Sequence, residues 1–295
     1  MKAVKMRTRH LAVATVVASL LFAACGSSGS SRSAGTATPT TANTAGTGTT
    51  PTVAAPPDIA KAGTLLFCSD ISYPPEEFYD GTTPVGSDIE IGREIAKRMS
   101  VKADFVNTGF DGIIPALVGK KCDAIISGMN DTTERKQQVD FVDYLSVGQS
   151  FMVQKGNPAG IKSIDDIAGK TVSVEVGTSN ADFLKAKSDE FTKAGKKGIT
   201  VQTFPKDTDA ATALRTGKVD AYFGDAPVVA YYVKQTPDAF TFGGDAINPI
   251  SVGIAIRKGD ALTAVVKTIV DGMYTDGTMA TILAQWEMSS TALQK

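Results

Sequence analysis

The alternation of strand-like and helix-like segments constrains the fold of this 295-residue chain more than any other feature. The apolar run TLLFCSD at 64–70 is typical of a buried strand, and the segment 87–100 places its apolar residues at helical spacing. A strand at 102–109, a helix at 110–120 and a strand at 122–128 follow. This β-α-β-α-β order predicts an α/β fold with a parallel sheet and helices packed on it.

A second series of the same kind lies further along the chain. Strands are expected at 170–176, 199–204 and 219–225, with helices at 179–191 and 208–218 between them. Both series contain a similar step from helix to strand, PALVGKKCDAI in the first and TALRTGKVDAY in the second. We therefore predict two α/β lobes that are built alike.

The remaining segments return to the first lobe through SVGIAIRKG and two further helices. We predict that lobe 1 consists of 59–149 plus 251–295, and that lobe 2 consists of 150–250. The crossing segments near 147–151 and 248–253 would act as a hinge. Because open α/β sheets bind ligands outside the carboxyl ends of their strands, the cleft between the lobes is the expected site.

The first 24 residues have the three-part pattern of a secretory signal peptide, with a charged start, an apolar core and small residues before Cys25. The ending LFAACG resembles a bacterial lipobox, in which Cys25 is diacylated and becomes the new N-terminus. The alternative is an ordinary signal peptide with an incidental Cys25. Residues 25–58 are mostly Ser, Thr, Ala, Gly and Pro, which predicts a disordered linker between the lipid anchor and the folded part.

Charge and composition exclude several functions. Removing residues 1–24 takes away four basic and no acidic residues, which changes the formal net charge from −1 to −5. An acidic domain without a basic cluster argues against nucleic-acid binding. The single histidine, His10, lies in the signal segment, so the mature chain has no imidazole for a metal site or a catalytic base. We predict no metal and no cofactor.

Two cysteines, Cys68 and Cys122, remain in the mature domain. An exported location permits a disulfide between them. Asp70 and Ser127 are expected at the ends of neighbouring parallel strands, which offsets the cysteines by about three residues, or roughly 10 Å of strand rise. That offset exceeds the usual reach of about 7 Å between α-carbons. The two arguments point in opposite directions, so the sequence leaves the pairing open.

The stretch Ser127–Arg135, SGMNDTTER, gathers groups that hold an anion. It follows an apolar strand and opens a helix, so free backbone N–H groups and a positive helix end meet small hydroxyls. The guanidinium of Arg135 has the fork geometry that matches a carboxylate. We interpret this stretch as a carboxylate clamp. The alternative is that Arg135 is a solvated residue bonded to Asp131 or Glu134.

The motifs at the other strand ends carry a wider resemblance. FCSDISYPPEEF, VGSDIEIGREIAKRM, FDGIIPAL, VDFVDYL, VEVGTS and GKVDAYFGD follow one another over some 230 residues. In this order they are similar to the polar amino-acid-binding family of extracytoplasmic solute-binding proteins, which feed ABC importers. The resemblance implies the type II periplasmic-binding-protein fold and a monomer. It also implies a lipid-anchored protein on the extracytoplasmic face of the membrane that captures an amino acid and delivers it to a permease.

The resemblance also implies roles for single residues. Arg135 would pair with the ligand carboxylate, with N–H groups of Asn130 and Ser179, and Asp225 would take the ammonium with the carbonyl of Gly128. The remaining residues expected at the ligand are Tyr73 and Phe110 as an aromatic sandwich, Asp70 at the side-chain end, and Ser127, Glu175 and Thr178 at strand exits. The alternatives are that Tyr73 and Phe110 are core aromatics and that Asp225 caps a helix.

Three positions depart from the family pattern. Glu76 replaces an aromatic residue, Asn130 stands where a small hydroxyl is usual, and Glu175 replaces an apolar residue. Asp70 and Glu175 together would place two carboxylates near the end of the ligand side chain. We therefore expect a cationic amino acid such as arginine, lysine or ornithine. Two rival functions are an amino-acid sensor and, on the same fold, a dehydratase-like enzyme.

Overall fold

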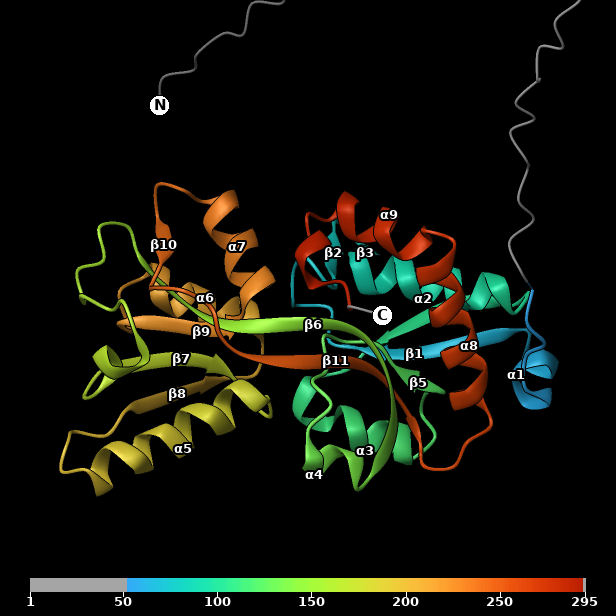
Figure 1. The fold of residues 1–295 in the computed structure, drawn as a ribbon, viewed down its shortest axis with the longest axis horizontal. Coiled ribbons are helices and arrows are strands. Elements are labelled where there is room, and N and C mark those ends of the chain that lie inside the picture. The colour runs from blue at the N-terminus through green and yellow to red at the C-terminus, as the bar shows by residue number, and fades with distance from the viewer. Residues whose placement is uncertain (1–51, 294–295) are drawn as a thin grey trace, which may run out of the picture. The chain divides into compact units, whose positions relative to one another are not determined.

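A nine-stranded mixed sheet runs through the part of the chain that the computed structural model describes, residues 52–293. Its strand order is β4-β1-β5-β11-β6-β9-β7-β8, and β10 pairs with β6 (Figure 1). The strands are β1 (Thr64–Ser69), β4 (Lys102–Asn107), β5 (Ala124–Ile125), β6 (Val139–Gln154), β7 (Thr171–Glu175), β8 (Thr200–Phe204), β9 (Ala221–Asp225), β10 (Phe240–Phe242) and β11 (Ile247–Arg257). A separate hairpin is formed by β2 (Phe78–Asp80) and β3 (Thr83–Val85).

Helices cover both faces of this sheet (Figure 1). They are α1 (Pro57–Ala62), α2 (Ser87–Arg98), α3 (Ile113–Val118), α4 (Thr133–Lys136), α5 (Ser179–Lys193), α6 (Asp207–Arg215), α7 (Ala226–Gln235), α8 (Leu262–Thr275) and α9 (Thr278–Gln285). None of the helices described between residues 52 and 293 is both long and apolar enough to span a membrane.

The two strand series predicted from the sequence form two parallel sets within the sheet. β1 pairs in parallel with β4 and β5, and β7 pairs in parallel with β8 and β9. The predicted α/β fold is confirmed. We call the group around β1, β4 and β5 lobe 1, and the group around β7, β8 and β9 lobe 2.

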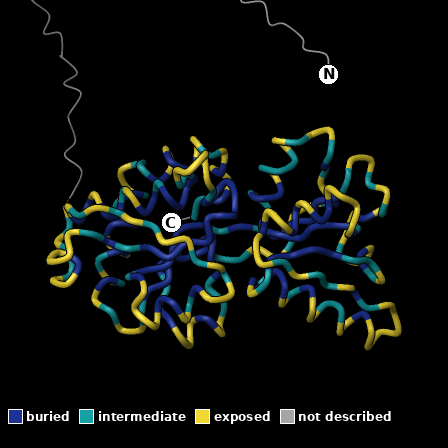
Figure 2. Tube along the Cα trace, turned by 180° about the vertical axis from the view of Figure 1, so that it is seen from behind, coloured by how far each residue is buried: buried dark blue, intermediate teal, exposed yellow. Residues whose placement is uncertain are grey.

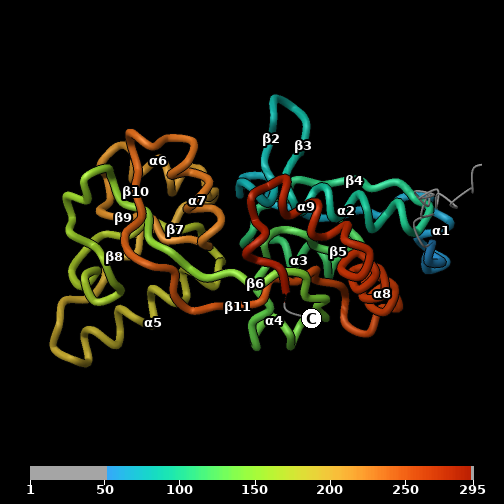
Figure 3. Tube along the Cα trace, turned by 45° about the horizontal axis from the view of Figure 1, so that its top comes forward, coloured from blue at the N-terminus to red at the C-terminus, as the bar shows by residue number. Residues whose placement is uncertain are grey.

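Two long antiparallel strands, β6 and β11, run from one lobe to the other (Figures 1 and 3). β11 pairs with β5 in lobe 1, β6 pairs with β9 in lobe 2, and the two strands pair with each other between. Each lobe also has its own buried apolar clusters, and the exposed residues gather at the loops and helix surfaces (Figure 2). Each lobe therefore has a core of its own, and a further buried cluster joins Tyr73 of lobe 1 to residues of lobe 2.

The last residues of the predicted disordered linker, 52–58, are packed on lobe 1. Helix α1 starts at Pro57, and the backbone N–H of Val53 donates to the carbonyl of Arg98 (2.8 Å). Val53 and Ala55 also pack against the core of lobe 1, which is why this segment is fixed. The predicted signal peptide, Cys25 and the linker up to residue 51 lie outside the described residues.

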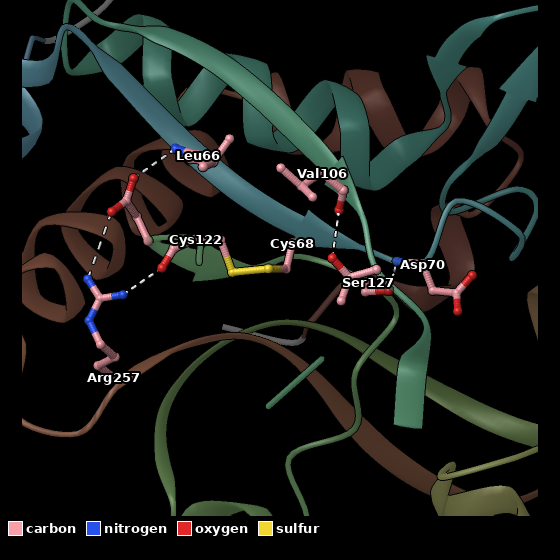
Figure 4. Close-up of a disulfide and its surroundings, with 9 residues drawn as sticks. Leu66, Cys68, Asp70, Val106, Cys122, Ser127 and Arg257 are labelled. Carbon is pink, nitrogen blue, oxygen red and sulfur yellow. Dashed lines mark hydrogen bonds and ion pairs between the residues drawn. A yellow bond between two sulfur atoms is a disulfide. The ribbon is translucent and has the colours of Figure 1, made fainter. Parts of the chain in front are cut away.

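Cys68 and Cys122 form a disulfide, with their α-carbons 5.7 Å apart (Figure 4). The argument from strand offset is wrong, because residues 121–123 form a bend rather than a strand. Asp123 lies beside Leu66, since its N–H donates to the carbonyl of Leu66 (2.8 Å) and its carboxylate accepts from the N–H of Leu66 (2.9 Å). The rise of an extended strand does not apply to the bend, so Cys122 comes within reach of Cys68.

Candidate functional site

A small, largely filled pocket lies where the carboxyl ends of the strands of both lobes meet. Most of the predicted ligand residues line it, and one further residue, Asn180, does so as well. The lining residues are Tyr73, Phe110, Gly128 and Asn130 from lobe 1, and Glu175, Thr178, Ser179, Asn180 and Asp225 from lobe 2. Three predicted residues, Asp70, Ser127 and Arg135, do not line this pocket.

Hydrogen bonds join the two lobes around the pocket. The hydroxyl of Tyr73 accepts from the backbone N–H of Asp225 (3.1 Å), and the hydroxyl of Ser179 donates to the side-chain oxygen of Asn130 (2.5 Å). Both bonds connect a residue that follows a strand of lobe 1 with a residue of lobe 2. The structure therefore shows the lobes in a closed arrangement. Tyr73 is both a polar contact between the lobes and, as the alternative expected, a buried member of an apolar cluster.

Arg135 lies next to Phe110, which lines the pocket. Its guanidinium lies over the Phe110 ring, 5.2 Å from the centroid. Nη1 donates to the carbonyl of Asn130 (2.8 Å), and Nη2 donates across the lobes to the carbonyl of Gly177 (3.1 Å). Burial lowers the pKa of Arg135, and the charges of Asp182 and Asp225 oppose that shift. A buried guanidinium whose partners include neutral carbonyls is well suited to an added carboxylate.

The local sequence explains how Arg135 reaches this place. Thr132 caps the short helix α4 and accepts from the backbone N–H of Arg135 (3.3 Å). Asp131, which the alternative interpretation paired with Arg135, forms an ion pair with Lys136 instead. The guanidinium is therefore directed inward, and the interpretation of Arg135 as a solvated surface residue is wrong.

Asp70 and Glu175 approach each other from opposite lobes. Asp70 is buried and accepts from the hydroxyl of Ser72 (2.7 Å) and from the backbone N–H of Phe110 (2.8 Å). Burial raises the pKa of Asp70, while the Ser72 and Phe110 bonds and the charge of Lys206 oppose the rise. Burial also raises the pKa of Glu175 well above its usual range, and the negative charges of Asp207 and Asp70 add to it. These two carboxyl groups interact electrostatically, which makes this end of the site acidic.

Asp225 ends β9 at the other side of the pocket. Its carboxylate accepts from the side-chain amide of Asn180 (3.1 Å) and makes no capping bond to helix α7. Burial raises the pKa of Asp225 to about 6, and the bond from Asn180 is the first of several contacts that oppose the rise. Asp225 occupies the N-cap position of α7, as the alternative expected, but its side chain makes no capping bond and lines the pocket instead.

Ser127 holds the loop beside the pocket instead of facing a ligand. Its hydroxyl accepts from the backbone N–H of Asp70 (2.9 Å; Figure 4) and donates to the carboxylate of Glu77 (2.8 Å). The next residue, Gly128, donates its N–H to buried Asp88 (2.8 Å), which also accepts from the Tyr144 hydroxyl. The predicted ligand contact at Ser127 is not supported, because both functions of its hydroxyl are already satisfied.

Thr178 also serves the local backbone. It caps helix α5 by accepting from the N–H of Ala181 (3.1 Å), and its hydroxyl donates to the carbonyl of Glu175 (2.8 Å). This cap fixes the helix so that its first residues, Ser179 and Asn180, line the pocket. The N-terminus of a helix favours negative charge, so the free N–H groups here suit a ligand carboxylate.

Comparison with known proteins agrees with this geometry. Residues 65–289 match the family of bacterial extracellular solute-binding proteins, family 3. The chain belongs to this family. It is 32% identical to the L-cystine-binding protein TcyJ of Escherichia coli K12, over 77% of this chain and 84% of that protein.

Two further similarities concern arginine. The chain is 31% identical to the putative ABC transporter arginine-binding protein 2 of Escherichia coli K12, over 76% of this chain and 91% of that protein. It also resembles the solved structure of an ancestral arginine-binding protein bound to arginine, with a TM-score of 0.71 and 38% identity over 76% of this chain and 98% of that one. The predicted family and its two-lobe α/β periplasmic-binding-protein fold are confirmed.

No sequence motif points to the buried amides of Asn180 and Gln149. Gln149 lies on crossing strand β6 and donates to Asn180 (2.5 Å), which in turn donates to Asp225. Glu77 and Asp88 were also missed as supports of the Ser127–Gly128 loop. Such residues are found only once the register of the strands is known.

Proposed function

We propose that this chain is the substrate-binding protein of an amino-acid ABC importer, and that it captures a cationic L-amino acid such as arginine, lysine or ornithine. The observation that carries the ligand class is the pairing of buried Asp70 and Glu175 from opposite lobes. Two buried carboxyl groups that face each other cannot both carry a negative charge without a cation between or beside them. A cationic side chain supplies that charge, and it does so only when the lobes close around it.

The amino-acid end of the ligand would be bound at the other side of the pocket. The ammonium group is assigned to Asp225 and to the carbonyl of Gly128. The carboxylate is assigned to Arg135, helped by N–H groups of Asn130 and Ser179. In the closed structure one N–H of Arg135 donates to Gly177 of lobe 2, so a carboxylate bound there would be contacted from both lobes.

Calorimetric titration of the mature domain with single amino acids tests the proposal. Arginine, lysine or ornithine should bind at least about 10-fold more tightly than glutamine or glutamate, since a hydrogen-bonded charge pair contributes about 1.5–3 kcal/mol. Tighter binding of glutamate or glutamine would overturn the cationic ligand. Absence of binding to every amino acid tested would overturn the function itself.

Cystine belongs in the same titration for a structural reason. Lys206 lies near Asp70, where its charge acts on the Asp70 carboxyl group and where both line one surface hollow. A lysine beside the acidic pair could hold the second carboxylate of a ligand that carries two amino-acid ends. If cystine binds most tightly, Lys206→Ala should weaken cystine selectively and leave arginine binding unchanged.

The location follows from the N-terminal segment. We propose that the chain is anchored through lipid on Cys25 at the extracytoplasmic face of the membrane and acts as a monomer with a permease. Metabolic labelling with a fatty-acid analogue should mark the wild-type protein and not Cys25→Ser, which should appear in the medium or periplasm. Equal labelling of both would refute the anchor. Turnover of amino acids or prephenate-like acids, lost in Asp70→Asn, would instead support the enzyme alternative.

A further inference from the structure

A chain of side-chain hydrogen bonds leads from the pocket to the crossing strands. Asn180 donates to the carboxylate of Asp225 (3.1 Å), Gln149 donates to the oxygen of Asn180 (2.5 Å), and Asn248 donates to the oxygen of Gln149 (2.8 Å). Asp225, Asn180 and Gln149 are each at most 3% exposed, whereas Asn248 is exposed at the surface. We call these four residues the amide relay.

The relay passes through the point where the crossing strands meet lobe 2. Gln149 of β6 pairs with Asp225 of β9 on one side and with Ile247 of β11 on the other. The pairing of β11 with β6 is interrupted between Ile247 and Ile250, and Asn248 lies in this irregularity with a φ of 51°. Asparagine is one of the few residues other than glycine that adopts this conformation readily. A break in strand pairing re-aims side chains, and here it accompanies the contact of Asn248 with Gln149.

The direction of the hydrogen bonds is the same at every step. Asn180 and Gln149 each use the NH₂ group toward the pocket and the oxygen toward the strand irregularity, and Asn248 donates its NH₂ group to Gln149, so the relay ends on an acceptor, the carboxylate of Asp225. Reversing one amide would place two oxygens or two NH₂ groups against each other. The orientation of Asp225 is thus tied to the local pairing of β6 and β11, and buried networks of this kind strengthen cooperatively.

We propose that Gln149 and Asn248 are positioning residues that couple the orientation of Asp225 to the closed arrangement of the lobes. This inference rests on the proposed function only in assigning the ligand ammonium to Asp225. In the arrangement that the structure shows, the pairing of β6 and β11 brings Asn248 to Gln149, and the completed relay holds Asp225 ready for a cation. Because the coupling is reciprocal, a ligand bound at Asp225 should in turn stabilise this pairing of β6 and β11. Removing one hydrogen bond of the relay should weaken ligand binding, although Gln149 and Asn248 are not assigned to contact the ligand.

Three variants test the coupling. Gln149→Met keeps the length of the side chain and removes both hydrogen bonds. Asn248→Gly removes the side chain at the surface end of the relay, and glycine readily adopts the positive φ of this position. Because Asn248 is exposed, this variant should fold normally. Gln154→Met is the matched control, since Gln154 lies on the same strand and donates instead to the carbonyl of Leu214 (3.1 Å), outside the relay.

The first measurement is the Kd for whichever amino acid binds the wild type most tightly. Gln149→Met and Asn248→Gly should raise it by at least about 5-fold, the lower range of ordinary coupling between sites. Gln154→Met should leave it near the wild-type value. Wild-type affinity in Asn248→Gly, or an equal loss in Gln154→Met, would overturn the proposal.

The second measurement needs no ligand and so separates this proposal from the proposed function. Small-angle scattering of the ligand-free domain should give a larger radius of gyration for Gln149→Met and Asn248→Gly than for wild type and Gln154→Met, because closure is less favoured. If the four proteins scatter alike, the relay does not influence closure, whatever the ligand is. If no amino acid binds but the scattering differs as expected, the relay stands and the ligand assignment fails.

Discussion

Reducing the bond between Cys68 and Cys122 should destabilise the domain strongly. The two cysteines are 54 positions apart, and both are buried in an apolar cluster of lobe 1. In the chain-entropy description, cross-linking a loop of this length lowers the entropy of the unfolded chain by an amount worth about 4 kcal/mol at 25 °C. The reduced thiols can stay in the apolar cluster at little cost, because free cysteine behaves as a small apolar residue. The predicted loss of unfolding free energy therefore comes mainly from the entropy that the unfolded chain regains when the loop is no longer closed.

Urea unfolding with and without reductant measures this loss. For a domain of this size, with a slope near 3 kcal/mol per molar urea, about 4 kcal/mol corresponds to a midpoint shift of roughly 1 to 2 M. The double variant Cys68→Ala, Cys122→Ala is the control, because reductant should not shift its midpoint. A wild-type midpoint that stays in place after complete reduction, verified by mass spectrometry, would refute the reasoning.

Three other predictions concern the site. Glu175→Gln should weaken arginine binding about 10-fold in calorimetry, whereas Asp189→Asn, at an exposed position of helix α5, should not; equal effects would argue against the acidic pair. Arg135→Lys should weaken all amino acids alike, and a change in side-chain preference alone would contradict the carboxylate assignment. Burial raises the pKa of Asp88 from 3.8 to about 6. As the pH rises, the unfolded state therefore loses the Asp88 proton at a lower pH than the folded state does. The contribution of Asp88 to thermal stability should therefore be complete below pH 3.8, its unfolded pKa, and should be lost as the pH rises through about 6, its folded pKa. Asp88→Asn should flatten that decline, and an unchanged pH profile of the melting temperature would refute it.

The architecture was predictable because it depends on local patterns. Strand and helix periodicity identified both parallel sets, and most of the polar residues predicted at the strand ends line one pocket, as the rule for open α/β sheets requires. Asp70 and Glu175 were brought together from distant segments in this way. Their proximity follows from topology, which the order of the elements fixes.

The rest could not be predicted, because it depends on bends and on exact strand register. The bend before β5 brought Cys122 to Cys68, and no periodicity announces a bend of that kind. Ser127 and Arg135 occur in the right segment, but their partners come from side chains and carbonyls whose positions are set by tertiary packing. The amide of Gln149 contacts Asn180 only because β6 pairs with β9 in one register.

The composition of the largest apolar core affects the order in which the chain can fold. This core joins Ile59 near one end of the described chain to Met288 near the other, whereas a core of lobe 2 needs only residues between Phe151 and Phe223. During vectorial synthesis, lobe 2 can collapse while lobe 1 still lacks α8 and α9. Lobe 1 is completed only when almost the whole chain has emerged, so the lobe with the earliest residues is the last to become stable.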